Sequence, residues 1–445
     1  MSLLHRYPSF GPGGIHPPEA KEDTRGSAIR QFDFAPVLMI PLSQHIGAPA
    51  VPVVREGQEV ERGQVLAKAD GFVSVPQHAP ASGVVRRIGL MPAITGKMAP
   101  GIYLEPFPGS SQEVAEGEPC NLDTASADDI IAAVQSAGIV GLGGAAFPTH
   151  VKLKPPEGKI VETLMVNGIE CEPFLTTDHR VMLEQTADVY MGIRYLLKAT
   201  GARHAIIGVE ANKLDAAEAL RAAAPDDIAV TTEVVAVKYP QGAEKMLITA
   251  LLGKEIPSGG LPADVGVANV NVATTAEIGR LLPHGRGIQE RVVTITGPAV
   301  RRKGNYRIPI GTPLRFALER VDVSDDVSLV FLGGPMMGQA LSNLDIPITK
   351  GTSGFVAFTE AETGNKKHEY PCIRCASCVD ACPIYLNPSQ MGLLANVGEH
   401  DRMADDYNLM DCFECGICSY VCPSHIPLVQ RFRISKAIVR EQQAA

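Results

Sequence analysis

Eight of the ten cysteines lie in two near-identical runs between residues 372 and 422. Each run has three cysteines spaced three residues apart and a fourth four residues later, directly before a proline. Three thiolates at this spacing can bind three corners of one iron–sulfur cubane when the backbone curls around it. The fourth thiolate then points away from its own loop toward a neighbouring site. The pattern therefore predicts electron transfer through two linked metal centres.

This is the spacing of bacterial two-cluster ferredoxins, in which the fourth cysteine of each run ligates the other cluster. We assign the first [4Fe–4S] cluster to Cys372, Cys375, Cys378 and Cys422. We assign the second [4Fe–4S] cluster to Cys412, Cys415, Cys418 and Cys382. Zinc sites use paired Cys-x-x-Cys knuckles, and disulfides need an oxidising compartment. Neither explains the repeated four-cysteine spacing as well as two iron–sulfur clusters do.

The composition limits the functions that the rest of the chain can have. A chain of 445 residues suggests about three domains. The net charge of −9, with no basic stretch interleaved with aromatic residues, argues against a nucleic-acid partner. The N-terminus lacks an apolar export signal, and no apolar run reaches about 18 residues, so we expect a soluble, cytosolic chain. Cys120 and Cys171 lie outside both runs, and we expect them to be buried or idle thiols.

The N-terminal part reads as an arm followed by a small β domain. Residues 1–45 are rich in Pro and Gly and are expected to form an extended arm. In 46–115, short strands alternate with turn glycines, which predicts a small all-β sandwich. The pattern resembles the lipoyl/biotinyl-type barrel-sandwich hybrid, whose carriers present a lysine at a hairpin tip. Here the tip is Asp70-Gly71-Phe72-Val73 and Lys68 precedes it. We interpret the module as a docking scaffold and keep a carrier domain as the alternative.

Two further domains are expected before the cysteine runs, so the fold class is multidomain α/β and α+β. Strands and helices alternate over 120–285, beginning with a capping-box-like start at Ser126 and Asp129, which predicts an α/β domain with a largely parallel sheet. Residues 288–360 are β-rich around one helix and fit a β-grasp (SLBB-like) domain. A polar linker at 363–367 would lead into a two-cluster ferredoxin domain at 365–435, with 387–411 mostly helical.

A glycine-rich loop is the second stretch that could do chemistry. Gly141, Gly143 and Gly144 are spaced so that the backbone can approach a phosphate or a flat ring, with adjacent N–H groups forming an anion-binding concavity. Alone it is a weak nucleotide signal, and Pro148 departs from the Rossmann arrangement, in which a helix follows directly. Polar residues also follow several expected strands, where the ligand sites of α/β sheets lie.

These segments together resemble the flavin-binding domain of the NADH-oxidising flavoprotein subunit of respiratory complex I. That family carries Gly-Arg-Gly-Gly-Ala-Gly-Phe-Pro-Thr-Gly-x-Lys, then Asn-x-x-Glu-x-Glu-Pro, Tyr-x-x-Gly-Glu-Glu and Asn-Asn-Val, matched here over roughly 125–285. The resemblance implies non-covalent FMN held by Gly141, Gly143 and Gly144, with Lys152 near the phosphate. It implies that the isoalloxazine and ribityl side is lined by Asn167, Glu170, Tyr239, Gly242, Glu244, Asn271 and Thr274. Phe147 and Glu172 would face the nicotinamide of the substrate NAD(H) as catalytic residues.

The chain departs from this family pattern at four positions. The loop Arg is Leu142, the fourth loop glycine is Ala146, the Asp after the Asn is Ile169, and Ala243 replaces the first acidic residue of the Glu pair. These substitutions bear on the binding of the dinucleotide more than on FMN.

The order of the segments is similar, across essentially the whole chain, to the RnfC (RsxC) family, the C subunits of Rnf ion-translocating oxidoreductase complexes. This resemblance implies a peripheral subunit on the cytoplasmic face of the bacterial inner membrane. It would exchange hydride between NAD(H) and FMN and relay single electrons through two [4Fe–4S] clusters. The implied partners are integral membrane and iron–sulfur subunits of an Rnf-type complex, and ferredoxin or a cluster-bearing partner subunit. Ion translocation would take place in those partners.

Two other functions remain open from the residues alone. The first is a soluble flavin and iron–sulfur reductase of a small molecule such as a corrinoid. The second is an electron wire that binds no dinucleotide because its glycine loop is degenerate.

Overall fold

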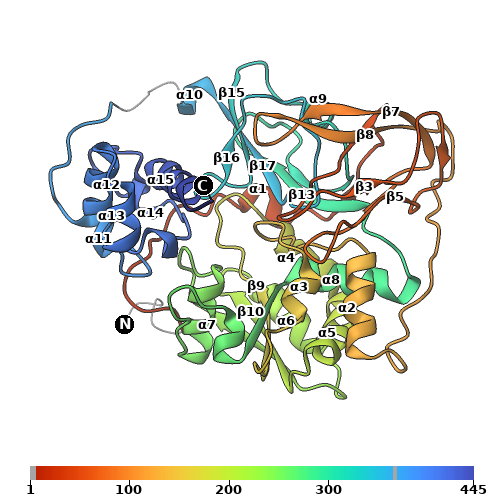
Figure 1. The fold of residues 1–445 in the computed structure, drawn as a ribbon, viewed down its shortest axis with the longest axis horizontal. Helices are drawn as coiled ribbons and strands as arrows, with labels where there is room; N and C mark the ends of the chain where they lie inside the picture. Colours follow the sequence, from red (N-terminus) through yellow and green to blue (C-terminus); the bar gives the residue numbers. More distant parts are fainter. Residues whose placement is uncertain (1–6, 364–367, 445) are drawn as a thin grey trace.

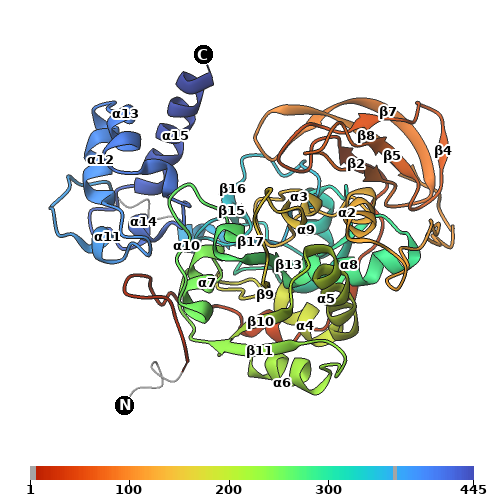
Figure 2. The same ribbon diagram turned by 60° about the horizontal axis from the view of Figure 1, so that its bottom comes forward.

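The computed structural model describes residues 7–363 and 368–444 (Figure 1). The linker expected at 363–367 lies, apart from Thr363, outside the described residues. Figure 2 shows a β-rich lobe and a helical C-terminal lobe on opposite sides of a central α/β region. Among the described residues, no helix is both long enough and apolar enough to cross a membrane.

The N-terminal sandwich consists of two antiparallel sheets. The first sheet contains, in spatial order, β2 (Leu38–Pro41), β8 (Met98–Pro106), β7 (Gly83–Pro92) and β4 (Glu59–Val60). The second contains β3 (Val51–Pro52), β5 (Val65–Lys68) and β6 (Gln77–His78). Inward-facing side chains such as Leu38, Ile40 and Leu66 are fully buried between the sheets. Strand β2 thus joins the sandwich although it lies within the segment expected as an arm.

The hairpin tip of the sandwich packs on the α/β domain. The ring of Phe72 meets His150 edge to face at 5.4 Å, and His150 Nε2 lies 2.6 Å from the Phe72 carbonyl oxygen. Gln135 Nε2 donates to the carbonyl of Ser74 at 3.0 Å. A tip held in this way is a docking contact, in agreement with the scaffold interpretation.

The central domain is a parallel sheet covered by helices. Its strands, in the order β11 (Val230–Val235), β10 (His204–Glu210), β9 (Thr163–Gly168) and β12 (Val267–Asn271), all run parallel. The helices are α2 (Ala127–Ser136), α3 (Thr149–Leu153), α4 (Thr177–Glu184), α5 (Thr186–Thr200), α6 (Leu214–Ala222), α7 (Glu244–Leu252) and α8 (Val272–Leu281), with 3₁₀ turns η2 (Pro262–Val265) and η3 (Leu282–His284). The capping box expected at Ser126 and Asp129 starts α2. The parallel α/β domain is therefore confirmed, and the carboxyl ends of its strands share one edge.

The next domain is a mixed sheet with one helix. The strand order is β1 (Arg30–Gln31), β14 (Gly304–Pro309), β13 (Glu290–Thr296), β17 (Gly354–Thr359), β15 (Val327–Leu332) and β16 (Gln339–Ala340). Strands β13 and β17 form a central parallel pair, flanked by the antiparallel pairings of β14 with β13 and of β15 with β17. Helix α9 (Leu314–Arg320) contributes to the core of the domain. This is the arrangement expected of a β-grasp domain. Its edge strand β1 comes from the N-terminal arm. Helix α10 (Glu360–Thr363) ends the domain.

The C-terminal domain repeats one backbone pattern twice. Every cysteine of the first run has a counterpart forty residues later, and so do three residues with positive φ: Arg374, Ala376 and Tyr385 recur as Glu414, Gly416 and His425. Its helices are α11 (Ser377–Asp380), α12 (Pro388–Asn396), α13 (His400–Asp405), α14 (Ile417–Tyr420) and α15 (Leu428–Ala444), with the 3₁₀ turn η4 (Leu409–Asp411). The segment between the runs is mostly helical, as expected.

Before β1 and β2, the arm crosses from the C-terminal domain past the α/β domain and forms the short helix α1 (Glu22–Arg25), which packs against β13 and β14 of the mixed sheet. Ile15 pairs with Tyr239 in an isolated antiparallel bridge, and the carbonyl of Glu19 accepts from Phe174 N–H. Lys21 is buried and its ammonium donates to the carbonyls of Glu170, Glu172 and Leu175. The arm is thus part of the packed structure.

Candidate functional site

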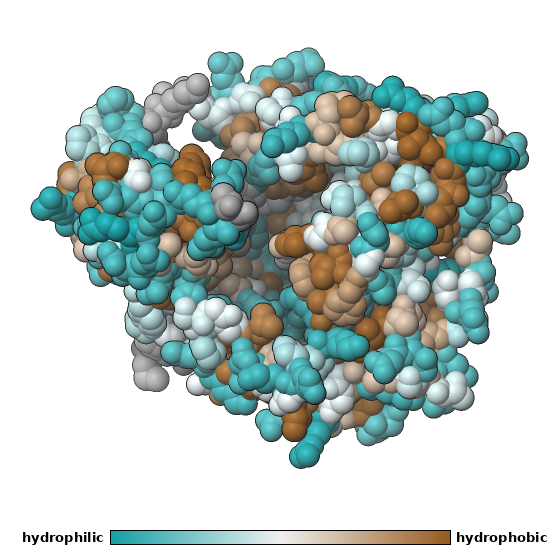
Figure 3. Space-filling view, viewed as in Figure 1, coloured by the Kyte–Doolittle hydropathy of each residue, from teal (hydrophilic) through white to brown (hydrophobic). Residues whose placement is uncertain are grey.

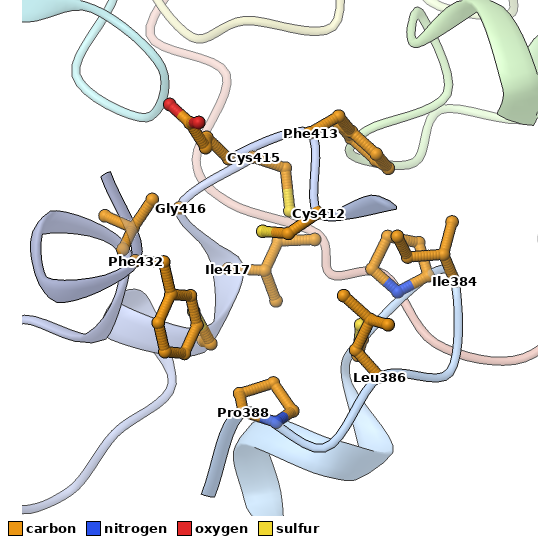
Figure 4. A pocket seen from close by; sticks show the side chains of 14 residues that line it. Ile384, Leu386, Pro388, Cys412, Phe413, Cys415, Gly416, Ile417 and Phe432 are labelled. Atoms are coloured by element: carbon orange, nitrogen blue, oxygen red, sulfur yellow. The ribbon is translucent and has the colours of Figure 1, made fainter. Parts of the chain in front are cut away.

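Two cavities divide the eight cysteines into two groups of four. One is lined by the second-run residues Cys412, Cys415 and Cys418 together with Cys382 of the first run. The other is lined by Cys372, Cys375 and Cys378 together with Cys422. The division is the one that the ferredoxin spacing predicts. Figure 4 shows apolar side chains, among them Ile384, Leu386 and Phe432, around the first of these cavities.

The chemistry of these donors suits polynuclear iron. Burial raises the pKa of the Cys415 thiol to about 12 and that of Cys378 to about 11, so a bound cation is needed to keep either as a thiolate at neutral pH. Burial also raises the pKa of Cys382. Hydrogen bonds from the backbone N–H groups of Ile384, Tyr385 and Leu386 partly offset that rise. Within the described ranges, no group of three or more His, Cys, Asp or Glu side chains is arranged around a single ion position. Four thiols around a cavity fit a cubane, which binds one sulfur at each corner.

The two cavities differ in their surroundings. Cys382 is buried, and the chain around Cys415 packs against Tyr239 of the α/β domain. Cys375 of the other group is exposed to solvent. The first group therefore lies beside the α/β domain, and the second includes a cysteine that is open to solvent.

The glycine loop lies at the carboxyl edge of the parallel sheet. Its entry is fixed by Leu142, whose N–H donates to Thr274 Oγ1 at 2.9 Å and whose carbonyl accepts from Arg291 at 3.1 Å. A Cβ at Gly143 would lie 2.4 Å from Nδ2 of Asn271, whose amide is held by hydrogen bonds to α8 and Asp178, so a larger residue would displace that amide. Gly144 is exposed, and an added Cβ would meet nothing within 4 Å. The loop thus offers bare backbone to open space, and Figure 3 shows the molecule hollowed at its centre.

Two asparagines face each other across the ends of β9 and β12. Asn167 and Asn271 are register partners in the parallel pair. Asn167 Nδ2 donates to the carbonyl of Gly242 at 2.9 Å. Asn271 Oδ1 accepts from the first turn of α8, and its Nδ2 donates to Asp178 Oδ2 at 2.7 Å. Burial raises the pKa of Asp178 to about 7. The side-chain amides therefore tie the ends of β9 and β12 to the Gly242 turn and to helices α4 and α8.

A charged pair and an unsatisfied acceptor lie on the same edge of the sheet. Lys152 Nζ is 3.2 Å from Glu244 Oε2, which also accepts from Asn269 Nδ2 at 3.0 Å. The buried Oδ1 atom of Asn269 has no hydrogen-bond partner among the described residues. A ligand hydroxyl is the natural donor for it. The bare glycine backbone, the cationic Lys152 and this orphaned oxygen together fit a phosphorylated, hydroxyl-bearing ligand such as FMN.

Four of the expected site residues make other contacts. Glu170 accepts from the N–H groups of Asp178 and His179 and so caps α4. Glu172, whose pKa is raised by burial, accepts at Oε1 from Met336 N–H at 2.7 Å.

The hydroxyl of Tyr239 donates to the carbonyl of Cys415 at 2.7 Å. Phe147 is half-buried and its carbonyl accepts from Gly141 N–H. In these contacts Glu172 and Tyr239 join domains, and the roles expected for them at the nicotinamide and the flavin stay predictions.

Two residues that hold the loops of the candidate site escape reasoning from motifs. Lys21 of the arm donates hydrogen bonds to backbone carbonyls of the 170–175 loop, and burial lowers the pKa of Lys21. Arg291 of β13 reaches from the β-grasp sheet to Leu142, the position where the flavoprotein family has its loop Arg. Nothing near either residue in the sequence marks it, because the contacts span more than 140 residues.

Comparison with known proteins agrees with this division of the chain. The RnfC barrel sandwich hybrid domain matches residues 10–107, the Nuo51 FMN-binding domain matches 134–280, and the 4Fe-4S dicluster domain matches 371–427. The expected sandwich, flavin and two-cluster domains are therefore confirmed, as are FMN and 4Fe-4S as the cofactor classes.

Three relatives match almost the whole of this chain, and two of them are of similar length. The C subunit of the proton-translocating ferredoxin:NAD(+) oxidoreductase complex of Clostridium ljungdahlii is 42% identical over 96% of this chain and 93% of that protein. The C subunit of the Na(+)-translocating complex of Acetobacterium woodii is 40% identical over 97% of each. The C subunit of the ion-translocating oxidoreductase complex of Haemophilus influenzae is also 40% identical over 96% of this chain, which spans 64% of that longer protein. The chain belongs to the RnfC family, the C subunits of ion-translocating ferredoxin:NAD(+) oxidoreductase complexes.

Proposed function

We propose that this chain exchanges electrons between NAD(H) and a ferredoxin or cluster-bearing partner, as the C subunit of an ion-translocating complex. One observation carries the proposal. The loops that carry Cys382 and Cys415, two of the four cysteines around one cavity, pack against Tyr239, which follows a strand of the domain that holds the glycine loop. The flavin domain and one proposed cluster site are thus in direct contact.

The residues of the flavin domain are proposed to bind and orient FMN. FMN, when bound, supplies two-electron exchange with NADH and one-electron exchange with iron–sulfur clusters. The N–H groups of Gly143 and Gly144 would face its phosphate or ring, and Lys152 would neutralise phosphate charge. Asn269 and Asn271 would hold the ribityl chain and the glycine loop. Asn167, Gly242, Glu244 and Thr274 would keep the strand ends in register around the ring.

The two cysteine groups are proposed to act in series. The group containing Cys415 lies toward the flavin domain, and the group containing Cys375 lies beside solvent. An external electron partner would therefore meet the site of Cys372, Cys375, Cys378 and Cys422. The segments are proposed to divide the work accordingly: arm 1–45 without β2, which joins the sandwich, sandwich 46–115, flavin domain 120–285, β-grasp domain 288–360 and two-cluster domain 365–435.

The setting is proposed from the family. The names of the relatives describe subunits of ion-translocating complexes, so this chain would sit as a peripheral subunit on the cytoplasmic face of a bacterial inner membrane. Integral membrane and iron–sulfur subunits would hold it there. Translocation would take place in those partners.

Anaerobic purification followed by NADH titration tests the proposal. We expect about eight irons and one flavin per chain, from two cubanes and one FMN. NADH should bleach the flavin absorbance and then the broad cluster absorbance. A flavin that NADH leaves oxidised would contradict the function and favour an electron wire without a dinucleotide site.

A second measurement separates a complex-bound chain from a free reductase. We expect the tagged chain to co-purify with integral membrane proteins from detergent-solubilised membranes. Recovery of the whole active population without membrane proteins, with NADH-driven reduction of a corrinoid, would favour the soluble reductase.

A further inference from the structure

The glycine-rich start of the arm lies between the flavin domain and one cysteine group. Gly14 N–H donates to the carbonyl of Ala381 at 2.9 Å, and Ala381 directly precedes Cys382. The next residue, Ile15, exchanges two hydrogen bonds of 2.9 Å with the backbone of Tyr239. Consecutive arm residues thus contact both a predicted cluster ligand loop and the end of a strand of the flavin domain.

Tyr239 makes the second connection between the same two regions. Its side chain is 2% exposed, and its hydroxyl donates to the carbonyl of Cys415. Around it, Ala381 and Ile417 form a small buried cluster with Ile15 and Met336. The loops of Cys382 and Cys415, two of the four residues around one cavity, are therefore both bound to one tyrosine and its arm partner.

The arm fits this gap only as glycine. Gly13 has φ +81°, and an added Cβ would lie 2.7 Å from the carbonyl oxygen of Cys382. Gly14 has φ +74°, and its Cβ would lie 2.7 Å from the carbonyl oxygen of Tyr239. Both neighbours are backbone atoms, which cannot move aside as the end of a side chain can. The close approach is therefore a requirement on two successive residues.

The arm is also held from the side of the flavin domain. Lys238 Nζ lies 4.1 Å from the centre of the Phe10 ring and donates to the carbonyl of Gly11 at 2.8 Å. Ala236 N–H donates to the carbonyl of Pro8, and Ser9 Oγ donates to Gln241 Oε1 at 2.8 Å. Residues 8–15 therefore follow the chain after β11 before they reach the cysteine loops.

We propose that residues 13–15 and Tyr239 form a clamp that fixes the cluster site of Cys382, Cys412, Cys415 and Cys418 against the flavin domain. They are positioning residues for electron transfer between the two sites. The contacts above are the evidence that the clamp exists, and its role in electron transfer rests on the proposed function. The clamp would act on electron transfer by fixing the distance between the two sites, because the rate of electron transfer falls as that distance grows.

Matched glycine variants test the clamp in the full-length, anaerobically purified protein. Gly13→Ala and Gly14→Ala place a Cβ in the clamp. Gly57→Ala is the control, because Gly57 has nearly the same φ, +80°, and open space around its Cβ. The control therefore carries the backbone strain without the overlap. Tyr239→Phe removes the hydroxyl and keeps the ring.

Three readouts are needed. Hydrogen exchange should become about tenfold faster at the amides of Gly14, Ile15 and Tyr239 in the two clamp variants, relative to Gly57→Ala. Iron and flavin contents and the cluster EPR signals after dithionite should stay those of the control. Reduction of the clusters by NADH should slow several-fold, because the distance between the flavin site and the cluster site is no longer fixed. Tyr239→Phe should also slow the reduction of the clusters by NADH.

The outcomes distinguish the clamp from the function. If exchange and NADH-driven cluster reduction in Gly13→Ala and Gly14→Ala equal those of Gly57→Ala, the clamp is overturned. If NADH does not bleach the flavin even in the unaltered protein, the proposed function fails. Exchange and dithionite EPR then still decide whether the clamp exists.

Discussion

Ala376 and Gly416 occupy equivalent positions in the two cysteine runs, forty residues apart, with φ of +63° and +81°. Alanine is accepted in the first run at the cost of a left-handed backbone. In the second run, a Cβ would lie 2.5 Å from the carbonyl oxygen of Met336 in the β-grasp domain. The glycine is therefore explained by the neighbouring domain, since the same turn forms with alanine elsewhere.

Gly416→Ala should consequently weaken the junction between the second run and the 333–338 loop. Overpacking of this kind costs about 1–3 kcal/mol. Urea unfolding of the anaerobic protein should show the loss, and hydrogen exchange should rise at Met336 and Met337. The control is Ala376→Gly, which places glycine in both runs and should not lower stability. Equal stability of Gly416→Ala and the unaltered protein would contradict the packing argument.

Ala146 has a left-handed backbone, φ +53°, in the glycine loop, at the position where the flavoprotein family has glycine. A left-handed residue with a Cβ costs about 1–2 kcal/mol. Ala146→Gly should therefore stabilise the protein by about 1 kcal/mol, measured as a higher urea midpoint at unchanged m value. The adjacent Ala145→Gly serves as control and should give no gain. A lower midpoint for Ala146→Gly would show that the strain is absent.

Lys350 is fully buried at the junction of three domains, where its ammonium donates to the carbonyls of Pro76 and Gly138. Burial lowers its pKa from 10.5 to about 7, and His78 faces it. Between pH 7 and 10.5 the unfolded chain then binds the proton that the folded chain releases. The contribution of Lys350 to stability is thus complete above pH 10.5 and is lost as the pH falls toward 7.

Lys350→Met should flatten this pH dependence. The difference in unfolding free energy between the unaltered protein and the variant should change by up to about 1.4 kcal/mol per pH unit in this window, favouring the unaltered protein at higher pH. Urea unfolding at pH 7, 8 and 9 measures it. Parallel profiles for the two proteins would mean that Lys350 keeps its proton when buried.

Local patterns predicted much of this molecule. Each cysteine run is a single loop, the capping box at Ser126 spans one helical turn, and strand–helix alternation marks a parallel sheet without knowledge of its partners. The glycine loop could be found for the same reason, because its closely spaced glycines are a pattern within one short segment.

Contacts between segments far apart in sequence could not be predicted in the same way. The arm supplies β1 to the β-grasp sheet and β2 to the sandwich. Nothing in the sequence of either strand indicates which strand it pairs with. Tyr239 was expected at the flavin from a motif, whereas its hydroxyl bonds to Cys415, 176 residues away. Such pairings are decided by packing of whole domains.

The exchange of fourth cysteines between the runs makes a specific prediction about iron. Cys382→Ser should remove the same EPR signal as Cys415→Ser, although Cys382 lies in the first run. Cys422→Ser should instead remove the signal lost in Cys375→Ser. Each variant should retain about four irons and its flavin. Loss of signals run by run, with Cys382 grouped with Cys375, would contradict the assignment.

The proposed phosphate contact can be tested with a matched pair of lysines. Lys152 and Lys159 are similarly exposed, and each pairs with one carboxylate, Glu244 at 3.2 Å and Asp264 at 2.9 Å. A surface ion pair contributes about 0–1 kcal/mol, so loss of either pair alone should change stability little. Lys152→Ala should nevertheless lose most of its FMN while keeping about eight irons, because it removes the charge opposite the phosphate. Lys159→Ala should keep both cofactors. Equal flavin contents in the two variants would remove Lys152 from the flavin site and leave the cluster assignments unchanged.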